Sequence, residues 1–320
     1  MGVLNARKRG LVGRVLRKRE GSPANDQDSN LIGQSKALPY LMSAPAIFVI
    51  CAILAFPVFY AIYYSLFRAE FLGAPQEWVG VRNYTELLTS ADFLWSLGRS
   101  GLFVVGCLLV GIPLSLFFAF ALSRAATRLR FFRGLSIAPY IVSSAAAAVM
   151  FRLLLNYDFG LINQILDLFG VTAVPWLREP TLAMASLIIA QLWTDIPLAI
   201  LLLLGGLQGI DPSLNDAATV DGAEGWTRTR LISIPLIAPQ LFLSIIWLSY
   251  GTLTSLGLVL ALTKGGPGGA TRTLPMEMYE TAFLRLEMNQ ALALVVVILG
   301  LNAVLTLLYY VLSNRYNQDE

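Results

Sequence analysis

The sequence predicts an all-α polytopic membrane protein. Three observations indicate this class: 56% of the 320 residues are hydrophobic, only 13% are charged, and the apolar residues form long blocks. Soluble domains carry about 25% charged residues, and the mean hydropathy here is +0.66. A soluble fold would have to bury all of these blocks in one core, so the bilayer is the better solvent for them.

Six apolar blocks are long enough to cross a membrane, because a hydrocarbon core of about 30 Å takes roughly 20 helical residues. They predict transmembrane helices near 40–67, 100–123, 135–156, 181–208, 237–263 and 288–313. The transmembrane domain is therefore expected over 40–313. Residues 1–39 form a basic tail and flexible linker before it, and 314–320 form a short tail after it.

The basic residues predict the orientation of these helices. With the N-terminus inside, 15 of the 23 Lys and Arg residues fall in the cytoplasmic segments. Cytoplasmic loops carry an excess of such residues. We therefore expect both termini in the cytoplasm.

The N-terminal tail carries seven basic residues within 7–19. They are consistent with a positive cluster that only sets topology, or with an amphipathic helix on anionic lipid or a partner. A cleaved signal peptide is not expected, because no short apolar run follows the charges.

The composition excludes several kinds of site. The chain has no histidine, which removes His-based metal centres, Ser-His-Asp triads and haem ligation by His. Cys51 and Cys107 lie alone inside apolar blocks and are interpreted as small hydrophobic residues. We expect no metal site, no catalytic residues, no cofactor on this chain and no nucleic-acid binding.

The cytoplasmic loop 209–236 is the most specific part of the sequence. Asp211 followed by Pro212 predicts a helix start. Leu214, Ala217 and Ala218 then share one face, and Gly222 predicts a sharp turn. Residues 211–223 contain no Lys or Arg, unlike helices that rest on lipid. A helix that docks on another protein is therefore the better interpretation.

The spacing of this loop resembles the EAA loop of permease subunits in binding-protein-dependent ABC importers. The matching residues are Asp216, Ala217, Ala218, Gly222 and the segment Ile232–Pro235. Asp216 replaces the family's Glu, and Ile234 replaces its Leu. In that family this loop is the coupling helix, which sits in a groove of the ATP-binding subunit.

A second stretch resembles carbohydrate-type permeases, specifically the maltose-permease-like half of their heterodimers. It comprises 262–267, Ala270-Thr271 and 281–283. Partial matches occur at 78–84, 160–163 and 175–177. The resemblance therefore extends over about 40–313.

The resemblance implies a type I ABC importer permease fold in a prokaryotic inner membrane. It implies a second permease, two copies of an ATP-binding subunit that holds ATP and Mg, and an extracytoplasmic binding protein. The transported solute is expected to be a di- or oligosaccharide, with glycerol 3-phosphate or a glycerophosphodiester as the alternative. Leu214, Asp216, Ala217, Ala218 and Gly222 would couple the chain to the ATPase.

One ionisable residue, Asp195, lies near the middle of the fourth predicted span. Such residues are costly in a membrane and mark either a pathway or a helix-packing hydrogen bond, and both interpretations remain open. Pro197 bends the same helix. By resemblance, the sugar contacts would come from two spans: Gln191, Thr194 and Asp195 on the fourth, and Tyr250, Thr252 and Ser255 on the fifth.

Two other classes of function are weaker. An ion-gradient transporter would predict related halves with matching broken helices, and the sequence shows no convincing internal repeat. An intramembrane enzyme would need histidine or paired carboxylates within the spans, which the sequence lacks.

Overall fold

The computed structural model describes residues 38–69, 76–124, 134, 138–223 and 225–318. The basic segment 7–19 lies outside these residues. The chain forms two units, 1–57 and 58–320, and their boundary falls at Pro57 within the first helix. In the first unit, residues 42–57 are helical and almost uniformly exposed.

The described elements are nearly all helical, as the sequence predicts. The exception is a two-residue antiparallel ribbon in which Phe67 pairs with Trp78. In chain order the elements are α2 (Leu38–Tyr64), β1 (Phe67–Arg68), β2 (Glu77–Trp78), α3 (Arg82–Thr89), α4 (Ala91–Arg124), α6 (Ser144–Leu154), α7 (Leu161–Leu168), α8 (Pro180–Gln208), α9 (Pro212–Val220), α10 (Gly225–Arg228), η3 (Thr229–Ser233), α11 (Ile234–Leu236), α12 (Ala238–Leu253), α13 (Gly257–Leu262), α14 (Leu274–Tyr279), η4 (Glu280–Leu284) and α15 (Met288–Gln318).

Four of the described helices are long and apolar enough to cross a membrane: 42–64, 91–123, 180–208 and 288–313. A fifth span is possible if Gly225–Leu236 and Ala238–Leu253 are counted together. The structure thus has four or five such spans, and the count of six stays a prediction.

Two predicted spans are interrupted. Within 135–156, Ser143 takes an extended conformation and caps α6, which leaves a helix of only 11 residues. Within 237–263, α12 ends at Leu253 because the backbone tightens: the Ser255 amide donates to the Thr252 carbonyl, three residues back (3.2 Å). The chain becomes helical again at Gly257.

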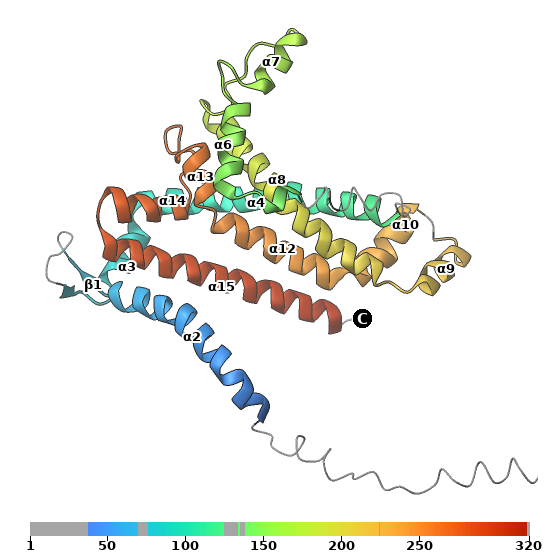
Figure 1. Ribbon diagram of the computed structural model, residues 1–320, viewed down its shortest axis with the longest axis horizontal. Helices are drawn as coiled ribbons and strands as arrows, with labels where there is room; N and C mark the ends of the chain where they lie inside the picture. The colour runs from blue at the N-terminus through green and yellow to red at the C-terminus, as the bar shows by residue number, and fades with distance from the viewer. Residues whose placement is uncertain (1–37, 70–75, 125–133, 135–137, 224, 319–320) are drawn as a thin grey trace, which may run out of the picture. The chain divides into compact units, whose positions relative to one another are not determined.

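Helices α4, α8 and α12 pack against one another in the second unit, and α15 packs against α12 (Figure 1). Glycine permits the close approach. A Cβ added at Gly111 of α4 would lie 2.7 Å from Leu192 Cδ2 and 3.1 Å from Leu248 Cδ1. Without water to drive helices together, small residues at such crossings let backbones approach and pack.

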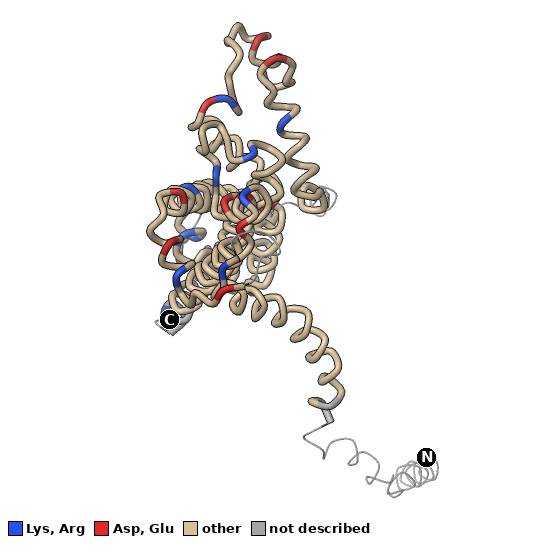
Figure 2. Tube along the Cα trace, turned by 90° about the vertical axis from the view of Figure 1, so that its left-hand side faces the viewer, with Lys and Arg blue, Asp and Glu red and all other residues tan. Residues whose placement is uncertain are grey.

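An ion-pair cluster fixes the segment after α13 to the start of α4. Arg272 lies 2.7 Å from Glu277 and 2.6 Å from Glu280, and Arg285 lies 3.2 Å from Asp92. Ser100 of α4 accepts a hydrogen bond from the Leu274 amide (2.8 Å). Most of the remaining trace carries no charge, as Figure 2 shows.

Two buried asparagines organise two loops. These loops contain the segments 78–84, 160–163 and 175–177, where the sequence resembles the permease family only partially. Asn83 donates to the carbonyls of Ser65 and Phe67, each at 2.7 Å. Asn163 accepts hydrogen bonds from the Val174 amide (3.1 Å) and the Trp176 indole (3.0 Å). The second loop, with α6 and α7, projects away from the packed helices of the same unit (Figure 1).

We expect Gly111→Leu to destabilise the protein, because the new side chain would overlap Leu192 and Leu248 in the packed interior. Overpacking of this kind costs about 1–3 kcal/mol, which a lower melting temperature in detergent would show. Gly101→Leu is the matched control, since a Cβ at Gly101 meets nothing within 4 Å. Equal stability of the two variants would contradict the packing argument.

Candidate functional site

A polar cavity of about 360 Å³ opens where α8 faces the break between α12 and α13. Five of the six predicted solute contacts line it, together with residues that sequence reasoning missed. The predicted ones are Gln191, Thr194, Asp195, Tyr250 and Ser255, and the others are Tyr140, Val142, Ser144, Trp247, Gly251, Thr254, Leu256 and Gly257. Residues from four segments therefore meet at one place.

Gln191 joins the polar groups of this cavity. Its Nε2 donates to Asp195 Oδ2 (2.6 Å), and its Oε1 accepts from the Ser255 hydroxyl (2.6 Å). Thr194 donates to Asp195 Oδ1 at 3.3 Å and to the Gln191 carbonyl at 2.8 Å. Carboxylate, amide and hydroxyl thus form one connected row that spans α8 and the break after α12.

Gly251 makes room for the carboxylate. A Cβ at this position would lie 2.9 Å from Asp195 Oδ2, so any larger residue would displace the side chain. The structure supports both interpretations of Asp195: it forms packing hydrogen bonds, and it also lines an open cavity.

Aromatic rings lie beside this polar row. Tyr140 and Trp247 stack edge to face with centroids 5.9 Å apart, and Tyr250 is 53% exposed. The Trp247 indole Nε1 is buried and has no hydrogen-bond partner among the described residues. Trp193, the ring nearest to Asp195 in sequence, instead packs against Phe151 in the apolar core.

The sixth predicted contact, Thr252, is not among the described residues that line the cavity. Its side chain is 2% exposed, and its hydroxyl donates to the Leu248 carbonyl within α12 (2.7 Å). The helical period explains the difference, because Thr252 is rotated about 100° from Gly251 around the helix axis.

The second candidate site is α9 in the loop 209–236. Asp211 caps its first turn by accepting from the Ser213 amide (2.8 Å), and this hydrogen bond lowers the pKa of the carboxyl. Gly222 ends the helix with φ +74°. The Ala223 amide donates to the Ala218 carbonyl (2.8 Å), and the Gly222 amide donates to that of Thr219 (3.1 Å). This is the Schellman arrangement, which needs a left-handed residue.

Only part of the predicted docking face of α9 is exposed. Leu214, Asp216 and Ala217 are exposed, whereas Ala218 is 3% exposed and packs inward. Val220, which sequence reasoning missed, is 87% exposed at the end of the helix. The exposed surface of α9 therefore combines apolar side chains with the carboxylate of Asp216 and carries no cation.

The chain bends sharply after this loop. The segment Gly225–Leu236 and α12 meet at 76°. The fifth span was predicted near 237–263, and the straight helix α12 begins at Ala238, because Ile237 leaves the helical conformation (φ −98°, ψ 12°) before Pro239. No group of three His, Cys, Asp or Glu residues that could hold a metal occurs in the part of the chain that the structure describes.

A family model described as "Binding-protein-dependent transport system inner membrane component" matches residues 111–318. The chain belongs to this family. The described lining of the cavity and the loop 209–236 both fall within the matched region. The prediction of a permease subunit of a binding-protein-dependent ABC importer, a multi-pass protein of the cytoplasmic membrane, is confirmed.

Curated relatives cover most of the permease. It is 32% identical over 279 residues to the sn-glycerol-3-phosphate transport system permease protein UgpA of Agrobacterium fabrum, which covers 86% of this chain and 95% of that protein. It is 32% identical over 252 residues to the trehalose/maltose transport system permease protein MalF of Thermococcus litoralis. This match covers 79% of this chain and 85% of that protein.

A solved structure shares the fold of the permease. A chain of a bacterial ABC transporter involved in the import of the acidic polysaccharide alginate matches with a TM-score of 0.74 at 20% identity, over 87% of this chain and 95% of that one. At this identity the likeness concerns the fold alone.

Proposed function

We propose that the permease passes a neutral sugar, a di- or oligosaccharide, from an extracytoplasmic binding protein across the membrane. The observation that carries this proposal is the row of Asp195, Gln191 and Ser255 beside the rings of Tyr140, Trp247 and Tyr250. A sugar offers hydroxyl donors and acceptors to the polar row, and its apolar faces suit the aromatic rings.

The relatives leave two substrate classes to choose between, since one is named for glycerol 3-phosphate and the other for trehalose and maltose. The described cavity lining favours the sugar, because it holds one carboxylate and neither Lys nor Arg. A phosphate would need charge-assisted donors and would be repelled by Asp195. Glycerol 3-phosphate or a glycerophosphodiester remains the second candidate, supported by the relative that is named for glycerol 3-phosphate.

The proposed transport cycle uses α9 as the coupling helix. The chain would have no catalytic site. Two ATP-binding subunits would hydrolyse ATP with Mg and dock on Leu214, Asp216, Ala217 and Gly222, with Ala218 supporting them from inside. A second permease would complete the cavity, and closure of the ATPases would open it toward the binding protein. The exposed, cation-free surface of α9 supports this assignment.

The proposed domain layout is a transmembrane domain at 40–313 between cytoplasmic tails at 1–39 and 314–320. In the proposed orientation six segments cross the membrane, with residues 138–154 as a short third crossing. The 209–236 loop is then cytoplasmic, and the loop around α7 is outside.

We expect Asp195→Asn to reduce sugar uptake by roughly tenfold or more, since a hydrogen bond to a charged group contributes about 1.5–3 kcal/mol. It should also relax rejection of glycerol 3-phosphate. Uptake of both labelled solutes into proteoliposomes of the complete transporter measures this. Asp167→Asn, an exposed aspartate on α7, is the control. Selectivity unchanged in Asp195→Asn would count against the assigned role.

We expect Gly222→Val to uncouple transport from ATP hydrolysis, because a β-branched residue at φ +74° cannot close the end of α9 without strain. Gly222→Asn should retain most uptake, since Asn tolerates this conformation. Uptake per ATP hydrolysed is the readout. Gly170→Val is the control for backbone strain alone, because Gly170 has nearly the same φ (+73°) and lies outside the loop 209–236. Normal coupling in Gly222→Val would exclude the mechanism.

We expect single cysteines to report the orientation in a chain whose Cys51 and Cys107 are replaced by serine. An impermeant thiol reagent should label Thr172→Cys in intact spheroplasts and Arg315→Cys only after lysis, and both positions are exposed. The reverse pattern would place the termini outside.

A further inference from the structure

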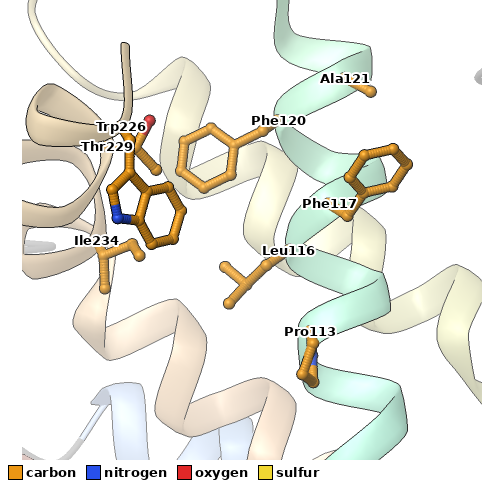
Figure 3. Close-up of a pocket in the computed structure, with 8 residues that line it drawn as sticks. All are labelled: Pro113, Leu116, Phe117, Phe120, Ala121, Trp226, Thr229 and Ile234. Carbon is orange, nitrogen blue, oxygen red and sulfur yellow. The ribbon is translucent and has the colours of Figure 1, made fainter. Parts of the chain in front are cut away.

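An apolar groove of about 450 Å³ separates the second half of α4 from the segment α10–α11 (Figure 3). The Trp226 indole and the Phe120 ring face one another across it, and Leu116 and Ile234 lie beside them. The complete described lining is Pro113, Leu116, Phe117, Phe120, Ala121, Trp226, Thr229 and Ile234. Its volume falls in the ~300–1,000 Å³ range of small-ligand pockets.

The lining offers almost nothing to a polar ligand. Thr229 supplies its one hydroxyl, which already donates to the Gly225 carbonyl (3.0 Å). The other lining side chains are hydrocarbon, apart from the indole N–H of Trp226. Burying a polar group here would leave it without partners, at a cost of a few kcal/mol. An alkyl chain fits the chemistry of the groove.

The groove opens where a membrane surface is expected. The segment Gly225–Leu236 makes an angle of 76° with α12, so it runs nearly along the bilayer plane if α12 crosses the bilayer. Trp226 is 71% exposed and Leu231 is 65% exposed. Tryptophan beside apolar residues is typical of the interface between headgroups and acyl chains.

Charge divides this loop into two parts. Residues 211–223 hold three aspartates and no cation, whereas 225–236 hold Arg228 and Arg230 and no acid. Arg230 is exposed and Arg228 half-buried, on the same short segment that supplies Trp226 and Thr229 to the groove. Basic sites next to membrane helices on the cytoplasmic side attract anionic headgroups.

We propose that this groove binds one anionic phospholipid of the cytoplasmic leaflet. One acyl chain lies between α4 and α10–α11, against Phe117, Phe120 and Trp226, and the phosphate faces Arg228 and Arg230. The inference uses the proposed orientation, and the cysteine-labelling experiment tests that separately. It does not depend on which solute is carried.

The lipid site has a mechanical consequence. The groove has one wall on a membrane helix and the other on the segment that joins α9 to α12. An occupied groove therefore resists relative movement of α4 and the coupling loop. Anionic lipid is expected to act on coupling without touching the solute cavity.

Trp226 itself provides the test. The complete transporter is placed in nanodiscs of zwitterionic phosphatidylcholine with a fixed minor fraction of phosphatidylglycerol. Either the phosphatidylglycerol or an equal amount of phosphatidylcholine carries brominated acyl chains, which quench tryptophan on contact. Subtracting the spectra of Trp226→Phe isolates the emission of Trp226. We expect brominated phosphatidylglycerol to quench the emission of Trp226 more strongly than the same amount of brominated phosphatidylcholine does.

Matched variants separate the two parts of the site. Arg228→Gln/Arg230→Gln should lower the preference for phosphatidylglycerol by roughly thirtyfold, given about 1 kcal/mol for each of the two basic residues near an anionic surface. Arg152→Gln/Lys264→Gln removes two exposed cations elsewhere and should keep the preference. Ala121→Phe should fill the groove and abolish quenching by either lipid, whereas Gly101→Phe, exposed near the other end of α4, should not.

Two results would overturn the proposal. Equal quenching of Trp226 by both lipids would show that the arginines select no headgroup. No quenching by either lipid would show that a protein segment, such as a helix of the second permease or the N-terminal tail, covers the groove instead.

Discussion

The hydrogen bonding of Asp195 is the constraint on which the interior of this permease depends. A carboxylate in the middle of an apolar helix costs several kcal/mol unless hydrogen bonds stabilise it. Gln191 and Thr194 meet this need from its own helix, and Gly251 leaves space on the facing helix. Because the second end of the Gln191 amide accepts from Ser255, the requirement extends into the break after α12. The same contacts that make the carboxylate tolerable hold the cavity open beside it.

The loop 209–236 is subject to a different constraint, because the chain has to change direction twice within a short segment. The first uses the left-handed Gly222, which closes the hydrogen bonds of α9. The second follows at Ile237, where the helix breaks before Pro239 and the direction changes by 76°. Before the first turn the chain exposes the acidic helix α9, and between the two turns it exposes a basic segment that carries Trp226. The two proposed surfaces, one for a protein partner and one for lipid, correspond to this division of charge along the loop.

Much of this arrangement was predictable from local patterns. Asp211-Pro212 and Gly222 mark the ends of α9 because capping depends on neighbouring residues alone. The candidate cavity residues Gln191, Asp195 and Ser255 followed from a family resemblance and a polar interruption of apolar helix. Tyr140, Trp247 and Gly251 carried no such signal, since their roles depend on which helices face each other. The interruptions at Ser143 and at 254–256 were missed for a different reason: hydropathy measures how apolar a block is, and a break of one to three residues hardly changes it.

The geometry of α8 links the two candidate sites. This helix carries Asp195 near its middle and ends at Gln208, directly before the Asp211 cap of the coupling helix. Its neighbour α4 contacts it at Gly111, where Leu192 and Leu248 from two helices converge on one small residue. Only residues 209–211 separate the end of α8 from the start of α9, so the cavity and the loop 209–236 are joined by one long helix and a short link. Since Leu192 is next to Gln191 and Leu248 is next to Trp247, close packing at Gly111 also keeps the polar row and the aromatic rings in register.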